Sequence, residues 1–325
     1  MDDPDLDTAD RDPSCPICAA PARYDFSGRD LMFDLHQPFD YYRCTGCGLI
    51  FMHPMPDAKT IAGFYPPTYD IYEDDDKPVK SGIWKRAILR ARLGYAHLDG
   101  GPLIALGALG ALPETTPHWV PGGRLLDVGC GNGRFLRSMR VLGWNVQGVE
   151  LSADGVRVCR KADLPVHHGD VVSAALTAES FDVITVRHVI EHIPEPRPFM
   201  RELVRVLKPG GRLIMETPNS QALGRAWLSV NWFANEIPRH LYLYHSGNLQ
   251  RLAADYGLHC ESLRLSTSPK ILLNSLDYIL ENHGRPSKYI RWRRLLARAY
   301  VWLAQRSCRG DIVHACFVKP LDGQR

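Results

Sequence analysis

Three groups of residues in this chain could do chemistry: two pairs of cysteines, a glycine-rich turn with acidic neighbours, and a set of histidines. The cysteines stand as Cys15-Pro-Ile-Cys18 and Cys44-Thr-Gly-Cys47. Each short turn lets two thiolate sulfurs reach one tetrahedral ion at about 2.3 Å. Because four thiolates leave no open coordination position, the spacing predicts a structural Zn²⁺ rather than a catalytic one.

The glycine-rich turn follows a predicted strand and reads Asp127-Val128-Gly129-Cys130-Gly131-Asn132-Gly133. Glycines lack Cβ atoms, so a ligand can lie against the backbone there. The next predicted strand ends in Glu150 about 20 residues later, where a carboxylate can accept hydrogen bonds from ribose hydroxyls. An acid before the turn would repel a pyrophosphate but suits the sulfonium and ammonium groups of S-adenosylmethionine. Alternatively, the glycines only set the turn geometry and the acids only cap it.

The histidines lie after the fourth predicted strand and in a later segment. A histidine that titrates near neutrality can take a proton from a hydroxyl or an acidic carbon. His192 is the first candidate for this base, while the neighbouring Glu191 orients it or contacts the substrate. His188 and His240 are expected to join them in space. The alternative is that Glu191 and His192 cap the following helix and hold the loop.

A parallel sheet would bring the glycine-rich turn and the histidines to the same edge. From residue 124 onward, short β runs alternate with helical segments, which predicts an α/β fold with a Rossmann-like, doubly wound, mostly parallel seven-stranded sheet. The carboxyl ends of such strands meet at the ligand-binding edge. Strands are predicted at 124–128, 145–150, 165–168, 181–186, 211–216 and 312–319.

The 325 residues are 45% hydrophobic and 23% charged, which is typical of a globular chain with one large domain and a smaller neighbour. We expect a small N-terminal zinc ribbon at 1–60, with strand-like pieces at 24–26 and 40–43. A linker and helical cap follow at 61–120, with a helix at 83–93 and a helical hairpin or cap at 100–112. The main domain is expected at 121–325, with helices 274–281 and 289–305 in an insertion at about 269–308.

The net charge of +3 argues against a nucleic-acid partner. The start of the chain has neither a basic nor an apolar signal region, and no apolar run reaches about 18 residues, so we expect a cytoplasmic protein. The helices at 83–93 and 289–305 mix basic with apolar residues. The helix at 83–93 could pack on the main domain or contact a membrane surface, as in a membrane-peripheral protein. The helix at 289–305 could rest on a membrane, bind an anionic substrate, or present a solvated basic face over an apolar packing face. The sequence does not indicate the oligomeric state.

The turn at 127–133 and the run Leu207-Lys208-Pro209-Gly210-Gly211 together resemble class I S-adenosylmethionine-dependent methyltransferases. The resemblance implies that the glycine-rich turn surrounds the methionine moiety, that Glu150 holds the ribose and that Asp170 lies near the adenine. The cofactor-binding residues that it implies are Asp127, Gly129, Cys130, Gly131, Gly133, Glu150, Leu151, Asp170 and Arg187.

A four-cysteine ribbon before such a core resembles a bacterial family associated with surface-polysaccharide, sugar and natural-product pathways. This likeness favours O-methylation of a small molecule, a sugar or a lipid-linked glycan. Deoxysugar C-methyltransferases share the ribbon but carry a further C-terminal domain, so C-methylation of a sugar is one alternative. An RNA-modifying or RNA-binding protein that uses the ribbon and basic helix is a second alternative, and a non-catalytic partner module that only binds the cofactor is a third.

The histidine group also resembles the metal site of the small-RNA 2′-O-methyltransferases, which bind a divalent ion through Glu-x-x-Glu-His and a distant histidine. His188, Glu191, His192 and His240 approximate that arrangement. Because His188 stands where that motif has its first Glu, a second metal here would be zinc, iron or manganese rather than magnesium.

Overall fold

A computed structural model describes residues 13–33, 37–66, 81–109, 115–282 and 293–321. Its larger sheet has seven strands in the order β10-β11-β8-β7-β4-β5-β6. The strands from β6 to β8 run parallel, while β11 is antiparallel to β8 and β10. The strands span Arg124–Val128 (β4), Asn145–Glu150 (β5), Val166–His168 (β6), Phe181–Arg187 (β7), Leu207–Pro218 (β8), His259–Ser266 (β10) and Ile312–Val318 (β11).

This sheet confirms the predicted doubly wound fold. The predictions for β4 and β5 match to the residue, and those for β6, β7 and β11 differ by one residue at an end. Strand β8 is longer than predicted, because the Lys-Pro-Gly-Gly turn is part of it. Strand β10 was not predicted, and its mostly exposed sequence explains the omission. The strand order reverses between β4 and β7, and ligands of such folds bind beyond the carboxyl ends at that point.

Alternating side chains along the strands build one hydrophobic core on each face of the large sheet. Leu125 and Val183 point into the core that α2 (Ile83–Leu93), α4 (Arg134–Val141) and α5 (Ala153–Lys161) cover. Leu126 and Ile184 point to the opposite core, beneath α6 (Pro196–Val206) and α8 (Ser246–Ala254). The sheet is therefore buried on both sides, and its carboxyl edge carries the loops.

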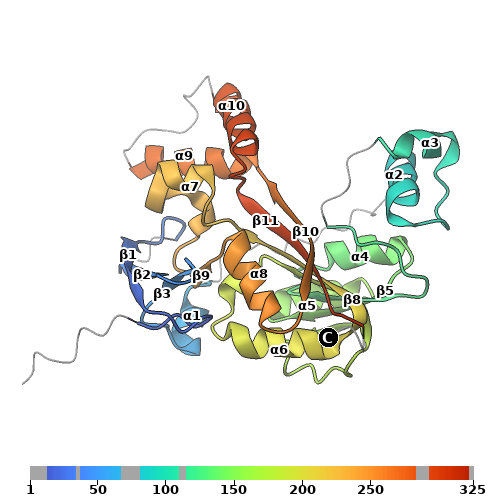
Figure 1. Ribbon diagram of the computed structural model, residues 1–325, viewed down its shortest axis with the longest axis horizontal. Helices are drawn as coiled ribbons and strands as arrows, with labels where there is room; N and C mark the ends of the chain where they lie inside the picture. Colours follow the sequence, from blue (N-terminus) through green and yellow to red (C-terminus); the bar gives the residue numbers. More distant parts are fainter. Residues whose placement is uncertain (1–12, 34–36, 67–80, 110–114, 283–292, 322–325) are drawn as a thin grey trace, which may run out of the picture.

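The N-terminal segment forms a second, antiparallel sheet in the order β1-β2-β3-β9. Its first three strands are Ala22–Gly28, Phe39–Cys44 and Ile50–Met52, and the fourth, Tyr242–Leu243, comes from the main domain. Ribbon residues such as Ile17 and Tyr41 share one core with α6 and α8. Figure 1 shows this sheet on the opposite side of the molecule from α2 and α3. The main domain thus supplies the fourth strand of the ribbon sheet, β9, which pairs with β3.

Short helices connect these parts. Helix α1 (Ala58–Gly63) follows β3, and η1 (Gly101–Leu103) leads into α3 (Ile104–Gly107), which packs on α2. The segment after β8 contains α7 (Leu223–Leu228), η3 (Ser229–Asn231) and η4 (Phe233–Asn235). The predicted insertion contains α9 (Pro269–Asn282) and α10 (Arg293–Arg306), between β10 and β11. The predicted segments at 1–12, 110–112 and 289–292 lie outside the described residues.

A buried ion pair joins the ribbon to the main domain. Arg239 donates to both carboxylate oxygens of Asp30, at 2.9 and 3.0 Å, and both side chains are almost completely buried. A bidentate pair of this kind fixes the position and the orientation of both groups. Removing one member would leave the other charge buried without its partner.

We therefore expect Arg239→Met to lower the free energy of unfolding by about 3–5 kcal/mol, because the Asp30 carboxylate would stay buried without its partner. Urea denaturation followed by tryptophan fluorescence measures the change. The matched control is Arg157→Met, which removes an exposed pair with Asp154 and should cost less than about 1 kcal/mol. Equal losses in the two variants would show that the buried pair has no special role.

Candidate functional site

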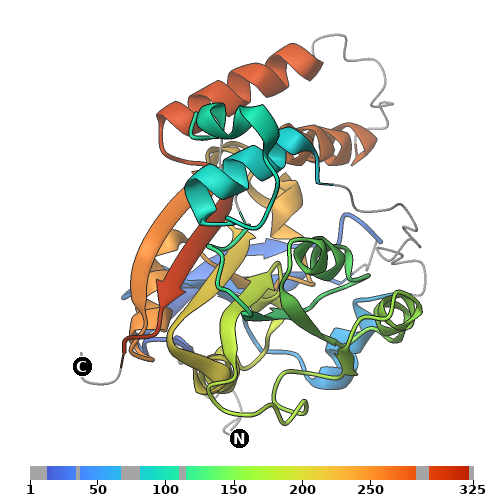
Figure 2. The ribbon, with the colours of Figure 1, turned by 90° about the vertical axis from the view of Figure 1, so that its right-hand side faces the viewer.

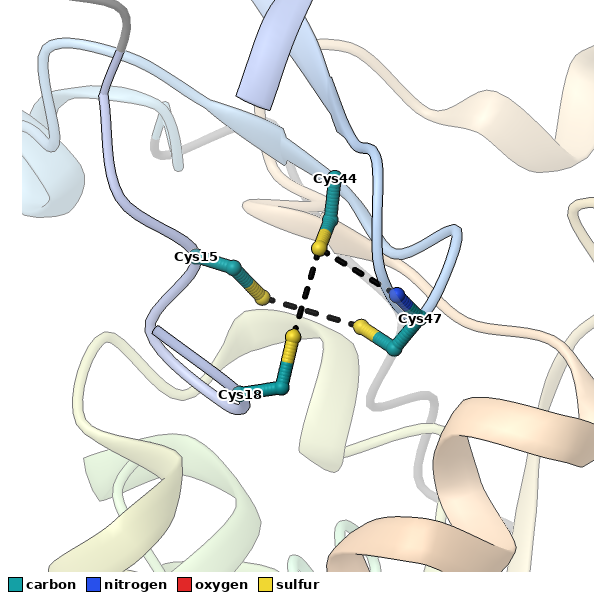
Figure 3. A group of neighbouring side chains, drawn as sticks. All are labelled: Cys15, Cys18, Cys44 and Cys47. Atoms are coloured by element: carbon teal, nitrogen blue, oxygen red, sulfur yellow. Dashed lines mark hydrogen bonds between the residues drawn. The ribbon is translucent and has the colours of Figure 1, made fainter. Parts of the chain in front are cut away.

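The four predicted zinc ligands converge (Figure 3). The Sγ atoms of Cys15 and Cys47 lie 3.7 Å apart, and those of Cys18 and Cys44 lie 3.3 Å apart. A tetrahedral ion with metal–sulfur bonds of about 2.3 Å needs sulfurs about 3.8 Å apart, so the donor set and its spacing fit zinc. The backbone N–H groups of Gly46 and Cys47 donate to the Cys44 sulfur, which stabilises a thiolate.

The glycine-rich turn links β4 to α4 and is closed by Glu150. Gly129, Gly131 and Gly133 all have positive φ angles, between 56° and 71°. One carboxylate oxygen of Glu150 accepts from the N–H of Gly131 at 2.7 Å, and the other accepts from the N–H of Ser152 at 2.7 Å. Since each carboxylate oxygen has two lone pairs, Glu150 can brace the turn and still accept hydrogen bonds from a ligand.

Asp127 lies at the end of β4, fully buried, and faces two residues of β7. Thr185 donates to one of its carboxylate oxygens at 2.6 Å, and Arg187 donates to the other at 3.2 Å. Burial raises the pKa of Asp127, while Arg187 and Thr185 oppose that shift. The Arg187 guanidinium also stacks on the Phe135 ring at 3.9 Å, and its Nε has no hydrogen-bond partner among the described residues. Arg187 therefore partly neutralises the charge of Asp127. The sequence did not predict this pairing.

The other predicted cofactor residues lie around the same edge with different exposure. Leu151 is 67% exposed just beyond β5, and Asp170 follows β6, where its carboxylate accepts from the N–H of Ser173 at 2.6 Å. The Cys130 thiol is buried 3.9 Å from the sulfur of Cys159. Any contact of Cys130 with a ligand would therefore come from its backbone, and its side chain belongs to the core.

The histidine group forms a second cluster at the carboxyl end of β7. Glu191 and His192 lie on η2 (Ile190–His192), and His240 reaches them from the segment before β9. The rings of His192 and His240 have their centroids 4.7 Å apart. One ligand atom from each of the three residues lies within 4.8 Å of the others, so the three could hold a metal ion. His188 lies beside this cluster, with its Nδ1 3.3 Å from a Glu191 oxygen.

Backbone carbonyls fix the tautomers of the two central histidines. The Nδ1 of His192 lies 2.9 Å from the carbonyl oxygen of Arg239, and that of His240 lies 3.0 Å from the carbonyl oxygen of Ala234. Because a carbonyl can only accept, each Nδ1 carries the hydrogen and donates it. When either ring is neutral, its Nε2 is left with a lone pair.

The carboxylates around His240 would attract a bound cation. Burial lowers the pKa of His240 to about 4, so its ring is neutral near pH 7. Its Nε2 lies 3.5 Å from a carboxylate oxygen of Glu236 and 4.0 Å from one of Glu191. Burial raises the pKa of Glu191, but His188, His240 and His192 outweigh that effect and lower it to about 2. Both carboxylate oxygens of Glu191 are buried, and their nearest polar neighbours among the described residues are the imidazoles of His188 and His240.

Sequence reasoning missed the residues that support this cluster from the N-terminal region. The Tyr65 hydroxyl, just after α1, lies 3.1 Å from the Nδ1 of His192. The Tyr41 hydroxyl on β2 donates to the carbonyl oxygen of His240 at 2.8 Å. These partners are 127 and 199 residues apart in sequence, and no local pattern predicts such contacts.

The seven-stranded sheet, whose strand order reverses between β4 and β7, defines a Rossmann-like domain. Residues 108–263 match the family described as "Methyltransferase domain". A curated relative from Xanthomonas oryzae pv. oryzae, named ubiquinone biosynthesis O-methyltransferase, is 35% identical over 175 residues, which cover 51% of this chain and 73% of the relative. The chain belongs to the class I S-adenosylmethionine-dependent methyltransferases.

Another relative of the same name, from Ralstonia nicotianae, is 34% identical over 142 residues. That alignment covers 41% of this chain and 59% of the relative's length, so the chain spans less than two thirds of it. A methyltransferase structure from Archaeoglobus fulgidus shares 18% identity and covers 61% of this chain and 86% of that one. Its TM-score of 0.44 adds nothing to the family assignment.

Gly129 lies where the glycine-rich turn meets the loop that leads into η2. A Cβ at this position would lie 2.4 Å from a methyl carbon of Val189, which precedes η2, and the φ of +71° strains any other residue. We expect Gly129→Ala to lower the free energy of unfolding by about 1–2 kcal/mol from backbone strain, with about 1–3 kcal/mol more from overpacking. Displacement of the turn should also weaken S-adenosylmethionine binding, which calorimetry measures.

The control for this prediction is Gly122→Ala, where φ is +66° but no atom lies within 4 Å of the new Cβ. It should show the backbone strain alone and keep the affinity for the cofactor. If both variants lose the same stability and both keep their affinity, the contact with Val189 does not couple the two loops.

Proposed function

We propose that this methyltransferase acts on a hydroxyl oxygen of a small acceptor, such as a sugar, a lipid-linked glycan or another small molecule. The observation that carries the proposal is the fixed tautomer of His192, which leaves its Nε2 free to accept a proton beside the cofactor edge. The relatives named as ubiquinone biosynthesis O-methyltransferases support transfer to oxygen in general terms. S-Adenosylmethionine, when bound, supplies a methyl group attached to a sulfonium.

The residues at the switch between β4 and β7 fit that cofactor. We propose that the glycine-rich turn lies along the methionine moiety, that Glu150 accepts from the ribose hydroxyls and that Leu151 and Asp170 lie beside the adenine. Because Asp127 is already paired, its role is to hold Arg187. The unpartnered Nε of Arg187 is then a donor for the carboxylate of the methionine moiety.

The acceptor hydroxyl lies, in this proposal, between the cofactor edge and the histidine cluster. His192 takes the hydroxyl proton on Nε2 as the oxygen attacks the methyl carbon and the carbon–sulfur bond breaks. The carbonyl of Arg239 holds the imidazole in the required tautomer and stabilises the imidazolium that forms, and the Tyr65 oxygen is a second acceptor for the same Nδ1 hydrogen. The chain's contribution is thus alignment and one proton transfer.

A second candidate mechanism uses a divalent ion at Glu191, His192 and His240. Two observations favour it: the buried Glu191 carboxylate faces the imidazoles of both His188 and His240, and the Nε2 lone pair of the neutral His240 faces the carboxylates of Glu191 and Glu236. Two imidazoles and one carboxylate suit zinc, iron or manganese. Such an ion would lower the pKa of a hydroxyl bound to it.

His192→Gln tests the reaction. Removing the base should lower kcat by about 10²–10⁴-fold and leave the dissociation constant for S-adenosylmethionine unchanged. The assay follows transfer of a tritium-labelled methyl group to hydroxyl-containing acceptors from cell extracts, and nuclear magnetic resonance of the product locates the methyl group. The control is His259→Gln, an exposed histidine on β10. A methyl group on carbon or nitrogen, or unchanged turnover in His192→Gln, would contradict the proposal.

We further propose that the four-cysteine cluster holds one structural Zn²⁺. Plasma mass spectrometry should then find one zinc per chain, and Cys44→Ser should lose it and lower stability, because the ribbon has little core of its own. The control is Cys260→Ser, an exposed cysteine outside the cluster. The second mechanism predicts another metal ion that His240→Ala removes while the zinc stays. Protein that keeps full stability without zinc would contradict the structural role.

A further inference from the structure

Helix α10 has apolar side chains on the face that it turns to solvent. Its inward face is short and buried, with Ala297, Tyr300 and Ala304 packed on the molecule. A helix packed on a protein normally turns polar residues outward. The outward face of α10 instead presents large apolar side chains that are 40–60% exposed, namely Leu295, Leu296, Trp302 and Leu303.

Positive charge borders this apolar face. Arg294, Arg298 and Arg306 are exposed on α10, and the guanidinium of Arg306 lies 5.7 Å from the centre of the Trp302 ring. The helix contains no acidic residue. Arg293 differs, because it pairs with Asp277 of α9 at 2.6 Å. The free face of α10 therefore combines leucine, tryptophan and arginine without a compensating acid.

Helices α2 and α3 present the same combination. Ile83 and Trp84 at the start of α2 are 50% and 44% exposed, and Leu106 in α3 and Leu109 just after it are 50% and 83% exposed. Helix α2 also has no acidic residue, and Lys85 is exposed beside Trp84. The other end of α2 is anchored, since Leu89 and Leu93 lie in the core. The exposed apolar end is thus held in a fixed position.

Both groups lie in the upper half of the molecule as Figure 1 draws it, with α10 at the top and the α2–α3 pair at the right edge. Figure 2, which looks from that right-hand side, shows α10 above and behind the α2–α3 pair. Eight of the fourteen exposed large apolar side chains among the described residues belong to these two groups. Scattered exposed leucines would need no explanation, but a concentration of this kind marks an interaction surface.

We propose that the outward face of α10 and the exposed ends of α2 and α3 form a face that binds the surface of anionic lipid bilayers. Tryptophan and leucine can enter the boundary between headgroups and acyl chains, while arginine and lysine contact anionic headgroups. A second copy of the chain fits poorly, because it would bring like charges together. No helix in the described part of the chain is long and apolar enough to cross a bilayer. The proposal is independent of the acceptor and of the reaction.

The test is co-sedimentation of the full chain with vesicles of phosphatidylcholine alone and with vesicles that also contain phosphatidylglycerol. We expect binding to the mixed vesicles, weaker binding to phosphatidylcholine alone, and loss of binding as salt rises. The double substitution Leu295→Glu and Trp302→Glu should weaken binding about tenfold or more, and Arg298→Gln about fivefold. These side chains are exposed, so the fold should persist, and calorimetry of S-adenosylmethionine binding checks this.

Val141→Glu is the matched control, since Val141 is 51% exposed on α4, outside the proposed face, and should leave vesicle binding unchanged. Absence of binding to the mixed vesicles, or equal binding by the double variant, would overturn the proposal. Sedimentation equilibrium provides a further check. A dimer that the double variant abolishes would assign the face to self-association instead.

Discussion

The geometry of the histidine cluster depends on the contacts that the segment from Arg239 to Leu243 makes. Its arginine is held by the buried pair with Asp30, and its backbone then serves both halves of the molecule. The carbonyl of Arg239 orients His192, and the N–H of Leu241 donates to the carbonyl of Glu191. The last two residues form β9 and complete the ribbon sheet. One short run of backbone thus sets the geometry of the histidine cluster and the position of the ribbon.

This arrangement changes the meaning of the ribbon. The sequence predicts a small metal-bound module without chemistry, and its cysteines do converge as expected. However, Tyr41 on β2 contacts the backbone of His240, and Tyr65 contacts the ring of His192. The N-terminal region therefore supports the histidine cluster directly. A disturbance of the four cysteines would therefore reach that cluster through β2 and β3.

The features that could be predicted from the sequence are those set by local pattern. Strands β4 and β5 are short β runs that end in a diagnostic glycine-rich turn or an acid, so their bounds were predicted correctly. The polar strand β10 gave no such signal, because it lies at the edge of the sheet and exposes most of its side chains. The pairing of Asp127 with Arg187 and the contacts of Tyr65 and Asp30 join residues far apart in sequence. Only the packed fold reveals these pairs, because the sequence around one partner contains no pattern that identifies the other.

The shared strand β9 also bears on how the chain folds during synthesis. The ribbon strands leave the ribosome before β9, and Tyr41 and its partner His240 are 199 residues apart. At about 5–20 residues per second, roughly 10–40 s separate the appearance of β3 from that of β9. During this interval the edge of β3 has no neighbour, and an open strand edge invites pairing with other chains. Binding of a metal by the four cysteines during this interval would hold the first three strands together before their last neighbour is made.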